Sequence, residues 1–424
     1  MKSKISTSAV AQQPRLRIAF LGLFGGTNLG NEATLNAVLA NLREKLSDVE
    51  IHCISPKGSP VRELHGAELI DLDPMPISRF LWRIRQPVLR SYLYRALQVL
   101  SEPLRRRRAR AHLRNIDLLV VPGTGIADDF GQGPLDLPLH LYRWSSTARQ
   151  VGVPTYFVSI GAGPVNHWLS RLLIRKALAF ANYRSYRDLA SRTFACELGL
   201  EIAKDSIMPD LAFSLPRRDA TADKPAHWPP RVIGLGVMAY HGWNESEQTG
   251  QEIYEAYIDK TRQFCRWLTE HGYSVRLLIG DTRADARPCE DLLLWAQSEL
   301  SSRDAAAVEY FPAHSVDDLL AQISATDLVI APRFHNVLLA LLLGRPTISI
   351  SYAEKNDHLM QSLDLRSDCC DIGQFSVPLL ISMFTKLAAE RDPTMPAARA
   401  RMNAFRGELD RQYEALFRLI PSRP

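Results

Sequence analysis

The chain has 424 residues, of which 46% are hydrophobic and 23% are charged. This balance is typical of a globular protein and excludes a fibrous or disordered one, and the length exceeds one ordinary hydrophobic core, so two domains are expected. No apolar run approaches the roughly 20 residues that a membrane-spanning helix needs. Residues 1–14 lack the apolar core of a secretory signal, and they are expected to form a flexible tail.

Cysteine spacing indicates a cellular compartment. The six cysteines include no CxxC pair, and only Cys369 and Cys370 are neighbours. This pattern argues against a zinc site and a disulfide framework. It predicts that no metal is required and that the protein works in a reducing, cytoplasmic environment.

Strands alternate with helices through residues 15–215. Leu16–Leu23 is an apolar strand, a glycine-rich turn follows it, and Glu32–Leu46 has helical spacing. Further strands are expected at Val49–Ser55, Asp117–Pro122, Thr155–Gly161 and Tyr183–Arg187, and helices at Leu135–Val151, Trp168–Ala181 and Leu189–Leu198. This alternation predicts an N-terminal Rossmann-like domain with a parallel, doubly wound sheet.

A basic segment interrupts that alternation as a helical insertion at residues 75–115. The formal net charge of the chain is +5, but residues 79–114 hold eleven arginines and a single acid, Glu102, so this segment carries +10 and the remainder carries −5. Apolar residues recur there at helical spacing, with arginines on the other side. A basic amphipathic helix predicts contact with an anionic membrane surface through Arg79–Arg114, so a cytoplasmic protein would sit peripherally on the inner membrane face.

The composition of the insertion is compatible with two other interpretations. One is a solvated helical hairpin that covers the sheet. The other is nucleic-acid binding, but the chain contains no recognition motif for nucleic acid, and no such partner is expected.

A proline-rich break at residues 216–230 is expected to link the two domains. The strand–helix pattern then restarts in a C-terminal Rossmann-like domain, residues 231–424, that includes two closing helices. The expected strands are Val232–Val237, Val275–Ile279, Val308–Phe311, Leu328–Ala331 and Thr347–Ser351. The expected helices are Tyr254–His271, Cys289–Leu300, Val316–Ile323, Asn336–Leu343, Phe375–Glu390 and Ala397–Leu419. The architecture is therefore two Rossmann-like α/β domains that face a cleft.

The tripeptide Arg333-Phe334-His335 lies where a buried strand ends and an apolar helix begins. Ligands of open α/β sheets bind at this edge, and a helix start adds free N–H groups and a partial positive charge. Arginine offers a fork for phosphate or carboxylate, and histidine moves protons near pH 7. An anionic ligand and a proton transfer are expected, although Arg333 pairing with a core carboxylate and His335 capping the helix would explain the same pattern.

Glycine-rich loops follow two strands of the first domain. In Gly25–Glu32, the N–H groups could cradle an anion, but the spacing departs from GxGxxG. Asn28 either binds a ligand or holds the turn, and Asn31 can cap the helix. The second loop, Gly123–Asp129, ends in two carboxylates that either act chemically or cap a helix.

Three more charged residues lie near expected strand ends. Arg187 follows a short strand and faces either Asp188 or a ligand anion. Asp210 precedes an apolar step and is expected to be mostly structural. Lys355, at the start of an expected helix, either adds a second cation to the site or is solvated.

Taken together, these motifs resemble the polysaccharide pyruvyl transferase family. The similarity runs from Ile18 to about Leu365, and its strongest parts are Asn28–Ala33, Arg333–His335, Gly344–Pro346 and Tyr352–Lys355. The resemblance implies a two-domain fold like that of GT-B glycosyltransferases. It also implies transfer of the enolpyruvyl group of phosphoenolpyruvate to two hydroxyls of a sugar or lipid-linked glycan precursor, which gives a pyruvate ketal and phosphate without a cofactor.

The resemblance also implies roles for individual residues. His335 maps onto the general acid/base, and Asp129 maps onto the acid that follows the first domain's glycine-rich strand and would stabilise positive charge. Arg333 and Arg187 would hold the donor's phosphate and carboxylate. The remaining substrate contacts are expected from Asn28, Gly30, Gly123, Gly125 and Lys355.

Two departures from the family pattern stand out. Asn31 replaces the usual aspartate, and Pro122-Gly123-Thr124-Gly125 replaces the usual triple glycine. The rival interpretations of the whole chain are a nucleotide-sugar-dependent glycosyltransferase on the same scaffold and a non-catalytic scaffold in glycan assembly.

Overall fold

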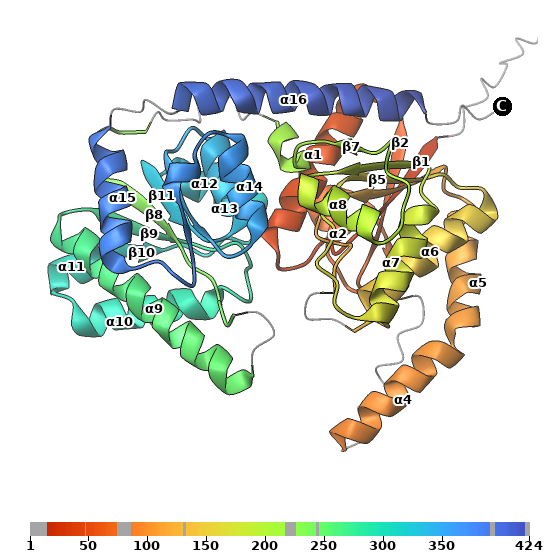
Figure 1. Cartoon of the computed structure of the whole chain (residues 1–424), viewed down its shortest axis with the longest axis horizontal. Coiled ribbons are helices and arrows are strands. Elements are labelled where there is room, and N and C mark those ends of the chain that lie inside the picture. The colour runs from red at the N-terminus through yellow and green to blue at the C-terminus, as the bar shows by residue number, and fades with distance from the viewer. Residues whose placement is uncertain are drawn as a thin grey trace, which may run out of the picture.

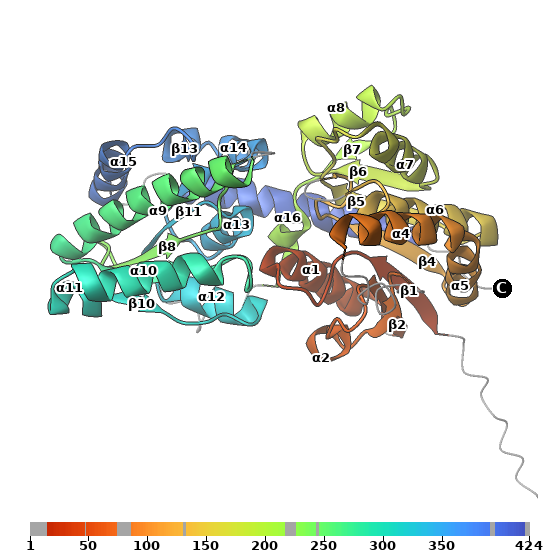
Figure 2. The same ribbon diagram turned by 90° about the horizontal axis from the view of Figure 1, so that it is seen from below.

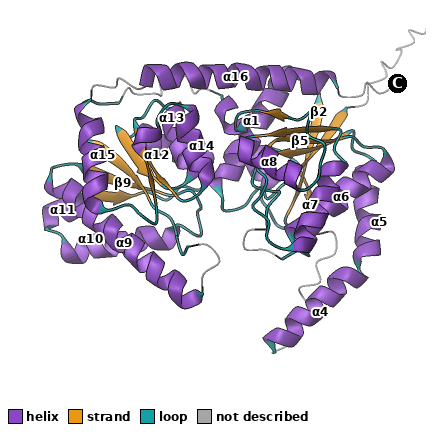
Figure 3. Ribbon diagram, viewed as in Figure 1, coloured by secondary structure: helices purple, strands orange, loops and turns teal. Residues whose placement is uncertain are grey.

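The computed structural model of the chain describes residues 15–46, 48–73, 86–129, 133–216, 226–242, 246–390 and 395–419. Two parallel sheets stand side by side, each with helices on both faces (Figures 1 and 3). Residues 15–216 form what we call the first lobe, and residues 226–390 form the second lobe. This arrangement confirms the expected α/β, doubly wound fold class.

The first sheet has seven parallel strands in the order β3-β2-β1-β4-β5-β6-β7. In chain order they are β1 (Leu16–Leu21), β2 (Val49–Ser55), β3 (Glu68–Asp71), β4 (Leu118–Pro122), β5 (Thr155–Ile160), β6 (Tyr183–Tyr186) and β7 (Ser206–Ile207). The helices of this lobe are α1 (Leu29–Lys45), α2 (Val61–His65), α4 (Pro87–Leu100), α5 (Glu102–Leu113), α6 (Leu137–Val151), α7 (Trp168–Ala179) and α8 (Leu189–Glu197), with the 3₁₀ turn η1 (Leu211–Ser214). The edge strands β3 and β7 escaped sequence analysis because they are short and only partly apolar.

The second sheet repeats the same winding with six strands in the order β10-β9-β8-β11-β12-β13. They are β8 (Val232–Gly236), β9 (Ser274–Leu278), β10 (Val308–Tyr310), β11 (Leu328–Ala331), β12 (Thr347–Ser351) and β13 (Cys369–Asp371). The helices are α9 (Glu247–Glu270), α10 (Ala286–Glu299), α11 (Ser302–Ala306), α12 (Val316–Ser324), α13 (Phe334–Leu342), α14 (Glu354–Ser362) and α15 (Val377–Ala389), with the 3₁₀ turn η2 (Arg366–Asp368). In both sheets the chain reverses its direction of winding between two central neighbours, β1 and β4 or β8 and β11, which is where ligands of such sheets bind.

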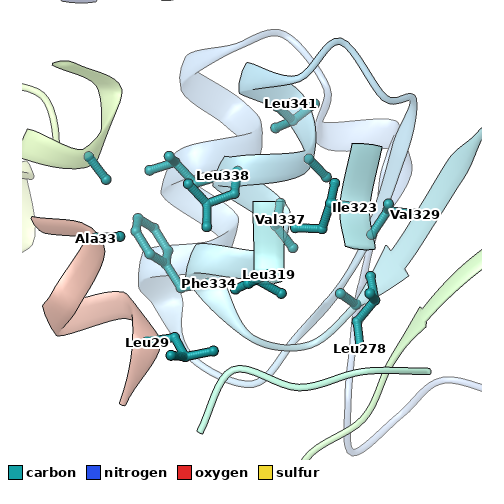
Figure 4. Close-up of a cluster of buried hydrophobic side chains, with 14 of the residues drawn as sticks. Leu29, Ala33, Leu278, Leu319, Ile323, Val329, Phe334, Val337, Leu338 and Leu341 are labelled. Atoms are coloured by element: carbon teal, nitrogen blue, oxygen red, sulfur yellow. The ribbon is translucent and has the colours of Figure 1, made fainter. Parts of the chain in front are cut away.

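The two lobes meet where the loops after their strands touch. The loop after β1 pairs with the loop after β9: Leu29 N–H donates to the Gly280 carbonyl (3.0 Å), and Thr282 N–H donates to the Thr27 carbonyl (2.8 Å). Behind this bridge α1 packs on α12 and α13, and Leu29 and Ala33 face the ring of Phe334 (Figure 4). The carboxyl ends of the central strands of both sheets are thereby brought together.

The last helix, α16 (Met395–Arg418), corrects the expected domain division. Sequence analysis assigned both closing helices to the second domain, yet α16 runs across both lobes (Figure 1). Its C-terminal half covers the first sheet: the Gln412 amide donates to Ser185 Oγ (2.9 Å), and the Tyr413 hydroxyl lies 3.0 Å from Ser214 Oγ. An apolar sheet face must be covered. The hydrophobic spacing of α16 predicts a helix with an apolar face but does not indicate which sheet that face covers.

The basic insertion forms two helices of unequal attachment. α5 packs along α6, whereas α4 projects from the first lobe on the side away from α16 (Figures 1 and 2). The N-terminal part of the expected insertion, residues 75–85, lies outside the described residues, as does the expected tail at residues 1–14. None of the described helices combines the length and apolarity needed to cross a bilayer.

The attachment of α16 leads to a first prediction. Replacing Tyr413 with alanine should destabilise the protein by about 3–5 kcal/mol, because a side chain that is only 2% exposed would leave a cavity beneath the first sheet. Tyr413→Phe keeps the packing and loses only the hydroxyl contact with Ser214, so a cost of about 1 kcal/mol is expected. Urea unfolding followed by circular dichroism measures both; equal costs for the two variants would contradict the packing role.

Candidate active site at the junction of the two lobes

His335 lies in the first turn of α13 and points at the first lobe. Pro332 ends the buried strand β11, Arg333 occupies the N-cap position, and α13 begins at Phe334, two residues earlier than expected. The imidazole of His335 rests on Gly30 in the first turn of α1; a Cβ on Gly30 would come within 2.0 Å of His335 Nδ1. The side chain of His335 keeps 17% of its surface exposed, so it is neither sunk in the core nor freely solvated.

Asp210 is the carboxylate that faces His335. His335 Nε2 lies 3.9 Å from Asp210 Oδ1, and the side chain of Asp210 is only 3% exposed. The same Oδ1 accepts the Ala212 N–H (2.9 Å), which fixes the carboxylate at the start of η1. Burial raises the pKa of Asp210, but the neighbouring His335 and Arg187 outweigh burial and hold that pKa below its ordinary value. Asp210 is therefore a buried anion that faces His335 across the lobe junction, a contact that goes beyond the mostly structural role expected from the sequence.

Arg187 completes this group from the end of β6. Its Nη1 lies 3.8 Å from Asp210 Oδ2, and its Nε lies 3.4 Å from Asp188 Oδ2. The guanidinium also stands over the ring of Phe334, 5.5 Å from the ring centre, so it reaches across to the second lobe. Gly161 provides the space, because a Cβ there would lie 2.6 Å from Arg187 Nη2.

Arg333 is held by Asp285, a carboxylate with no exposed surface. Arg333 Nε donates to Asp285 Oδ2 (2.9 Å), and Nη2 donates to Oδ1. Burial opposes the charge on Arg333, but Asp285 outweighs it and raises the pKa of the guanidinium. Asp285 also accepts the N–H groups of Gly280 (3.0 Å) and Asp281 (2.8 Å). The pairing with a core carboxylate, left open by sequence analysis, is present, and 19% of the Arg333 side chain is still exposed.

Tyr352 marks the place where three cations converge. Burial raises its pKa, but Lys355 above all, and then Arg333 and Arg187, lower it below the ordinary value for tyrosine. Lys355 Nζ lies 4.7 Å from the centre of the Tyr352 ring. Lys355, Arg333 and Arg187 thus act on the same phenol, although Lys355 lies in the first turn of α14, Arg333 at the N-cap of α13 and Arg187 directly after β6.

Asn28 and Asn31 shape the first loop. Asn28 is the N-cap of α1, and its Oδ1 accepts the N–H groups of Gly30 (2.9 Å) and Asn31 (3.3 Å), so the cap is not Asn31 as sequence analysis allowed. Asn31 Nδ2 instead donates to the Leu23 carbonyl (3.5 Å), a bond that the family's usual aspartate could not make when ionised. Asn28 and Gly30 therefore hold the turn against which His335 packs.

The glycine-rich loop after β4 has a different structural task from the expected one. A Cβ on Gly123 would meet the Ser159 carbonyl at 2.4 Å, and Ser159 has a φ of 51°, so Gly123 allows a close approach of two strands. A Cβ on Gly125 would approach Asp128 Oδ2 at 3.0 Å. Among the described residues, neither glycine forms a hydrogen bond with His335.

Asp129 lies apart from the His335 group among the described residues. Its two carboxylate oxygens accept the N–H groups of Asn166 (3.3 Å) and His167 (3.0 Å), which tie the loop after β4 to the loop before α7. No hydrogen bond or ion pair of the described chain joins Asp129 to His335. Because Asp210 is the carboxylate beside His335, it fits the charge-stabilising position that the family resemblance gave to Asp129.

One group of described residues has the spacing of metal ligands, but it is far from His335 in the fold. Glu50, His52 and Glu68 lie toward the amino-terminal end of β2 and β3, the opposite end of the sheet from the site. Both carboxylates already pair with arginines, Glu50 with Arg17 (2.9 Å) and Glu68 with Arg62 (2.9 Å).

The arrangement of charges suits a small anion and a proton transfer. The positive charges of Arg187, Arg333 and Lys355 all act on Tyr352, and His335 faces the carboxylate of Asp210 at 3.9 Å. Sequence analysis found the cations and His335 but overlooked Asp210 as a partner, Asp285 and Tyr352. Asp210 and Asp285 meet their partners only through long-range packing, whereas Tyr352 belongs to the segment Tyr352–Lys355 that carries part of the family resemblance.

Gly30 offers a test of the lobe contact. Gly30→Ala should displace the His335 ring, because its Cβ would overlap Nδ1, while the protein still folds, since alanine is favoured over glycine in a helix by about 1 kcal/mol. A crystal structure should show the ring moved away from Asp210. Gly407→Ala in α16, where a Cβ meets nothing closer than 3.8 Å, is the matched control and should leave the His335–Asp210 distance at 3.9 Å. An unmoved ring in Gly30→Ala would contradict the packing.

The buried charge of Asp210 should appear in the pH dependence of stability. Its folded pKa is lowered, so its contribution is present above the unfolded pKa of about 4 and is lost as the pH falls through the folded pKa. Asp210→Asn cannot titrate, so the stability difference between wild type and variant should be largest near neutral pH and shrink below about pH 4. Urea unfolding at a series of pH values measures this; curves that stay parallel throughout would show that Asp210 is not a stabilised anion.

Several solved structures of other proteins have a similar two-lobe fold. Among solved structures, the chain is similar to UDP-GlcNAc 2-epimerase from Neisseria meningitidis bound to UDP-GlcNAc (TM-score 0.58, 9% identity, 96% of this chain and 100% of that one). It is also similar to UDP-GlcNAc 2-epimerase from Methanocaldococcus jannaschii (0.55, 9%, 89% and 94%) and to the glycosyltransferase SnogD from Streptomyces nogalater (0.51, 14%, 95% and 99%). At these identities the likeness shows the fold, which is of the GT-B type.

The sequence comparisons give the family. No curated protein sequence matches the chain. The family model described as polysaccharide pyruvyl transferase matches residues 28–354, which include strands of both sheets and the site residues Arg187, Asp210, Asp285, Arg333, His335 and Tyr352, and end one residue before Lys355. The chain therefore belongs to the polysaccharide pyruvyl transferase family.

Proposed function

We propose that this transferase moves the enolpyruvyl group of phosphoenolpyruvate onto two hydroxyls of a sugar in a glycan precursor, forming a pyruvate ketal and releasing phosphate. The observation that carries the proposal is the His335–Asp210 pair formed across the lobe junction beside Arg187, Arg333 and Lys355. Family membership supports the transferase class, and the site's charges support this donor.

The three cations suit the donor. Phosphoenolpyruvate carries a phosphate and a carboxylate on a three-carbon unit, so it needs several cations within a small space. Arginine forks match both groups, and the start of α13 adds its partial positive charge beside Arg333. Arg333 is immobilised by Asp285, so it is already in position when the donor arrives.

His335 is placed to supply and recover the proton that the reaction needs. Protonation of the donor's methylene carbon generates positive charge at its central carbon, and the first sugar hydroxyl then adds there. The negative charge of Asp210 would stabilise the cationic state that develops. The neutral His335 can then accept the proton of the attacking hydroxyl, which restores its starting state.

The second addition closes the ketal ring and completes the balance of atoms. Addition of the second hydroxyl to the central carbon breaks the bond to the phosphate oxygen, and the second hydroxyl proton leaves with the phosphate. The product is a methyl-bearing ketal carbon joined to two sugar oxygens. We propose a sugar or lipid-linked glycan as the acceptor and a cytoplasmic location, which the six free cysteines support.

Phosphate release from phosphoenolpyruvate tests the proposed roles of His335 and Asp210, with Asp129 as the control. His335→Ala should lower kcat by about 10²–10⁴-fold, as expected for loss of general acid–base catalysis, and Asp210→Asn should lower it substantially. Asp129→Asn is the matched control, because Asp129 bonds only to loop amides, and it should retain most of the activity. The assay uses purified protein with a panel of nitrophenyl and lipid-linked sugars, and mass spectrometry checks the product for one added ketal unit.

Binding measurements separate this proposal from its rivals. Phosphoenolpyruvate should raise the melting temperature of wild type and His335→Ala alike, and Arg187→Gln should weaken that protection. Equal activity of His335→Ala and wild type would refute the proton-transfer role. Protection by UDP-GlcNAc but not by phosphoenolpyruvate would favour a nucleotide-sugar enzyme instead.

A further inference from the structure

Helix α4 exposes an unusual concentration of large apolar side chains. Six of them stay exposed between residues 89 and 104, and two are among the most exposed in the described chain: Leu100 at 76% and Tyr92 at 68%. The six are Leu89, Tyr92, Leu93, Val99, Leu100 and Leu104. Single exposed apolar residues are ordinary, but a contiguous set of this kind marks an interaction surface.

The five exposed residues of α4 share one face of that helix together with Ala96, whereas Leu104 lies in α5. Positions 89, 92, 93, 96, 99 and 100 follow the i, i+3, i+4, i+7 spacing of an apolar stripe. Gln98 lies on the opposite side and is buried, with its amide donating to the Tyr94 hydroxyl (2.6 Å). In an ordinary surface helix the apolar stripe faces the core, so α4 has the reverse orientation. We call this stripe, residues 89–100, the α4 face.

The arginines of the insertion divide into two groups. Arg105 is fully buried and donates to Asp73 and Ser101, and Arg106 pairs with Glu102 (2.9 Å) and stacks on Tyr142. These two fasten α5 to the lobe, so the whole basic run is not a free surface as sequence analysis implied. The exposed group comprises Arg95, Arg107, Arg108, Arg110 and Arg114.

Glu102 is the only acidic residue of α4 and α5, and its carboxylate is already paired with arginines. Glu102 accepts from Arg143 (2.8 Å) as well as from Arg106, both of which lie against the body of the lobe. The exposed surface of α4 and α5 therefore presents apolar side chains and arginines without any acidic residue. This combination complements an apolar layer bordered by negative charge.

The attachment of α4 leaves its face accessible. α5 is fixed along α6 by the bonds of Arg105, Arg106 and Glu102, whereas α4 continues beyond the turn at Ser101 and projects from the lobe (Figures 1 and 2). Its 14 residues are too short to cross a bilayer, which takes about 20. A helix of this kind lies in the plane of a membrane interface.

We propose that the α4 face docks on an anionic lipid bilayer, with its apolar stripe among the acyl chains and the exposed arginines of α4 and α5 on the headgroups. A second copy of this chain is a poorer occupant, because like charges would meet. An acidic protein partner would pair with the arginines, but an acidic surface does not complement an apolar stripe that includes residues of 68% and 76% exposure. The proposal is independent of the reaction at His335.

Vesicle sedimentation of the full chain tests the proposal. Wild type should bind vesicles of mixed phosphatidylglycerol and phosphatidylcholine, bind pure phosphatidylcholine weakly, and lose affinity as salt rises. Replacing Tyr92, Leu93 and Leu100 together by glutamine should weaken partitioning roughly a hundredfold. Replacing Arg95, Arg107 and Arg114 by glutamine should weaken binding to anionic vesicles by a similar factor at low salt and flatten the salt dependence.

Matched controls carry the same changes elsewhere. Leu64, Leu294 and Leu379 are exposed leucines outside α4, and Arg175, Arg303 and Arg411 are exposed arginines on other helices; their glutamine variants should bind vesicles like wild type. Hydrogen exchange should show protection of residues 87–104 on vesicle binding. Equal binding to neutral and anionic vesicles, absence of binding by wild type, or a dimer that only the stripe variant dissociates would each overturn the proposal.

Discussion

The imidazole of His335 lies directly on the backbone of Gly30, and the rest of the site depends on this contact between lobes. It places Nε2 beside Asp210, a carboxylate of the first lobe, at 3.9 Å. Because His335 and Asp210 come from different lobes, the pair exists only while the lobes are together. The backbone bridge between Leu29 and Gly280 holds them in that position from the other side of the same loop.

Arg333 and Arg187, two of the cations at the lobe junction, are held in position by different contacts. Arg333 is fixed by a buried carboxylate that also binds two backbone N–H groups, so its position is set by the second lobe alone. Arg187 belongs to the first lobe, yet it stacks on Phe334 of the second and shares Asp210 with His335. A donor held by both would therefore sense the position of both lobes, and its charge would add to the forces that keep them closed.

Local sequence pattern was sufficient for the fold and for the position of His335. The apolar runs of β11 and α13 bracket Arg333-Phe334-His335, and alternation of strands and helices gives both sheets. The local sequence pattern was insufficient where a contact joins residues that are far apart in the chain. Asp210 meets a histidine from the other lobe, Asp285 meets Arg333 from a different loop, and neither pairing leaves a periodic signal. The three short edge strands β3, β7 and β13, and the sorting of the arginines into buried and exposed ones, likewise depend on packing.

The crossing of α16 has a consequence for how the protein is made. The polar cluster under the first sheet joins Ser159 to Gln412, 253 residues later in the chain. Domains tend to fold in order as they leave the ribosome, but here the earlier lobe keeps an apolar face open until α16 has been synthesised. The N-terminal half of α16 also packs on the second lobe, where Arg401 pairs with Asp364. Both lobes therefore wait for the last helix, and the open face of the first sheet is where chaperones would be expected to bind.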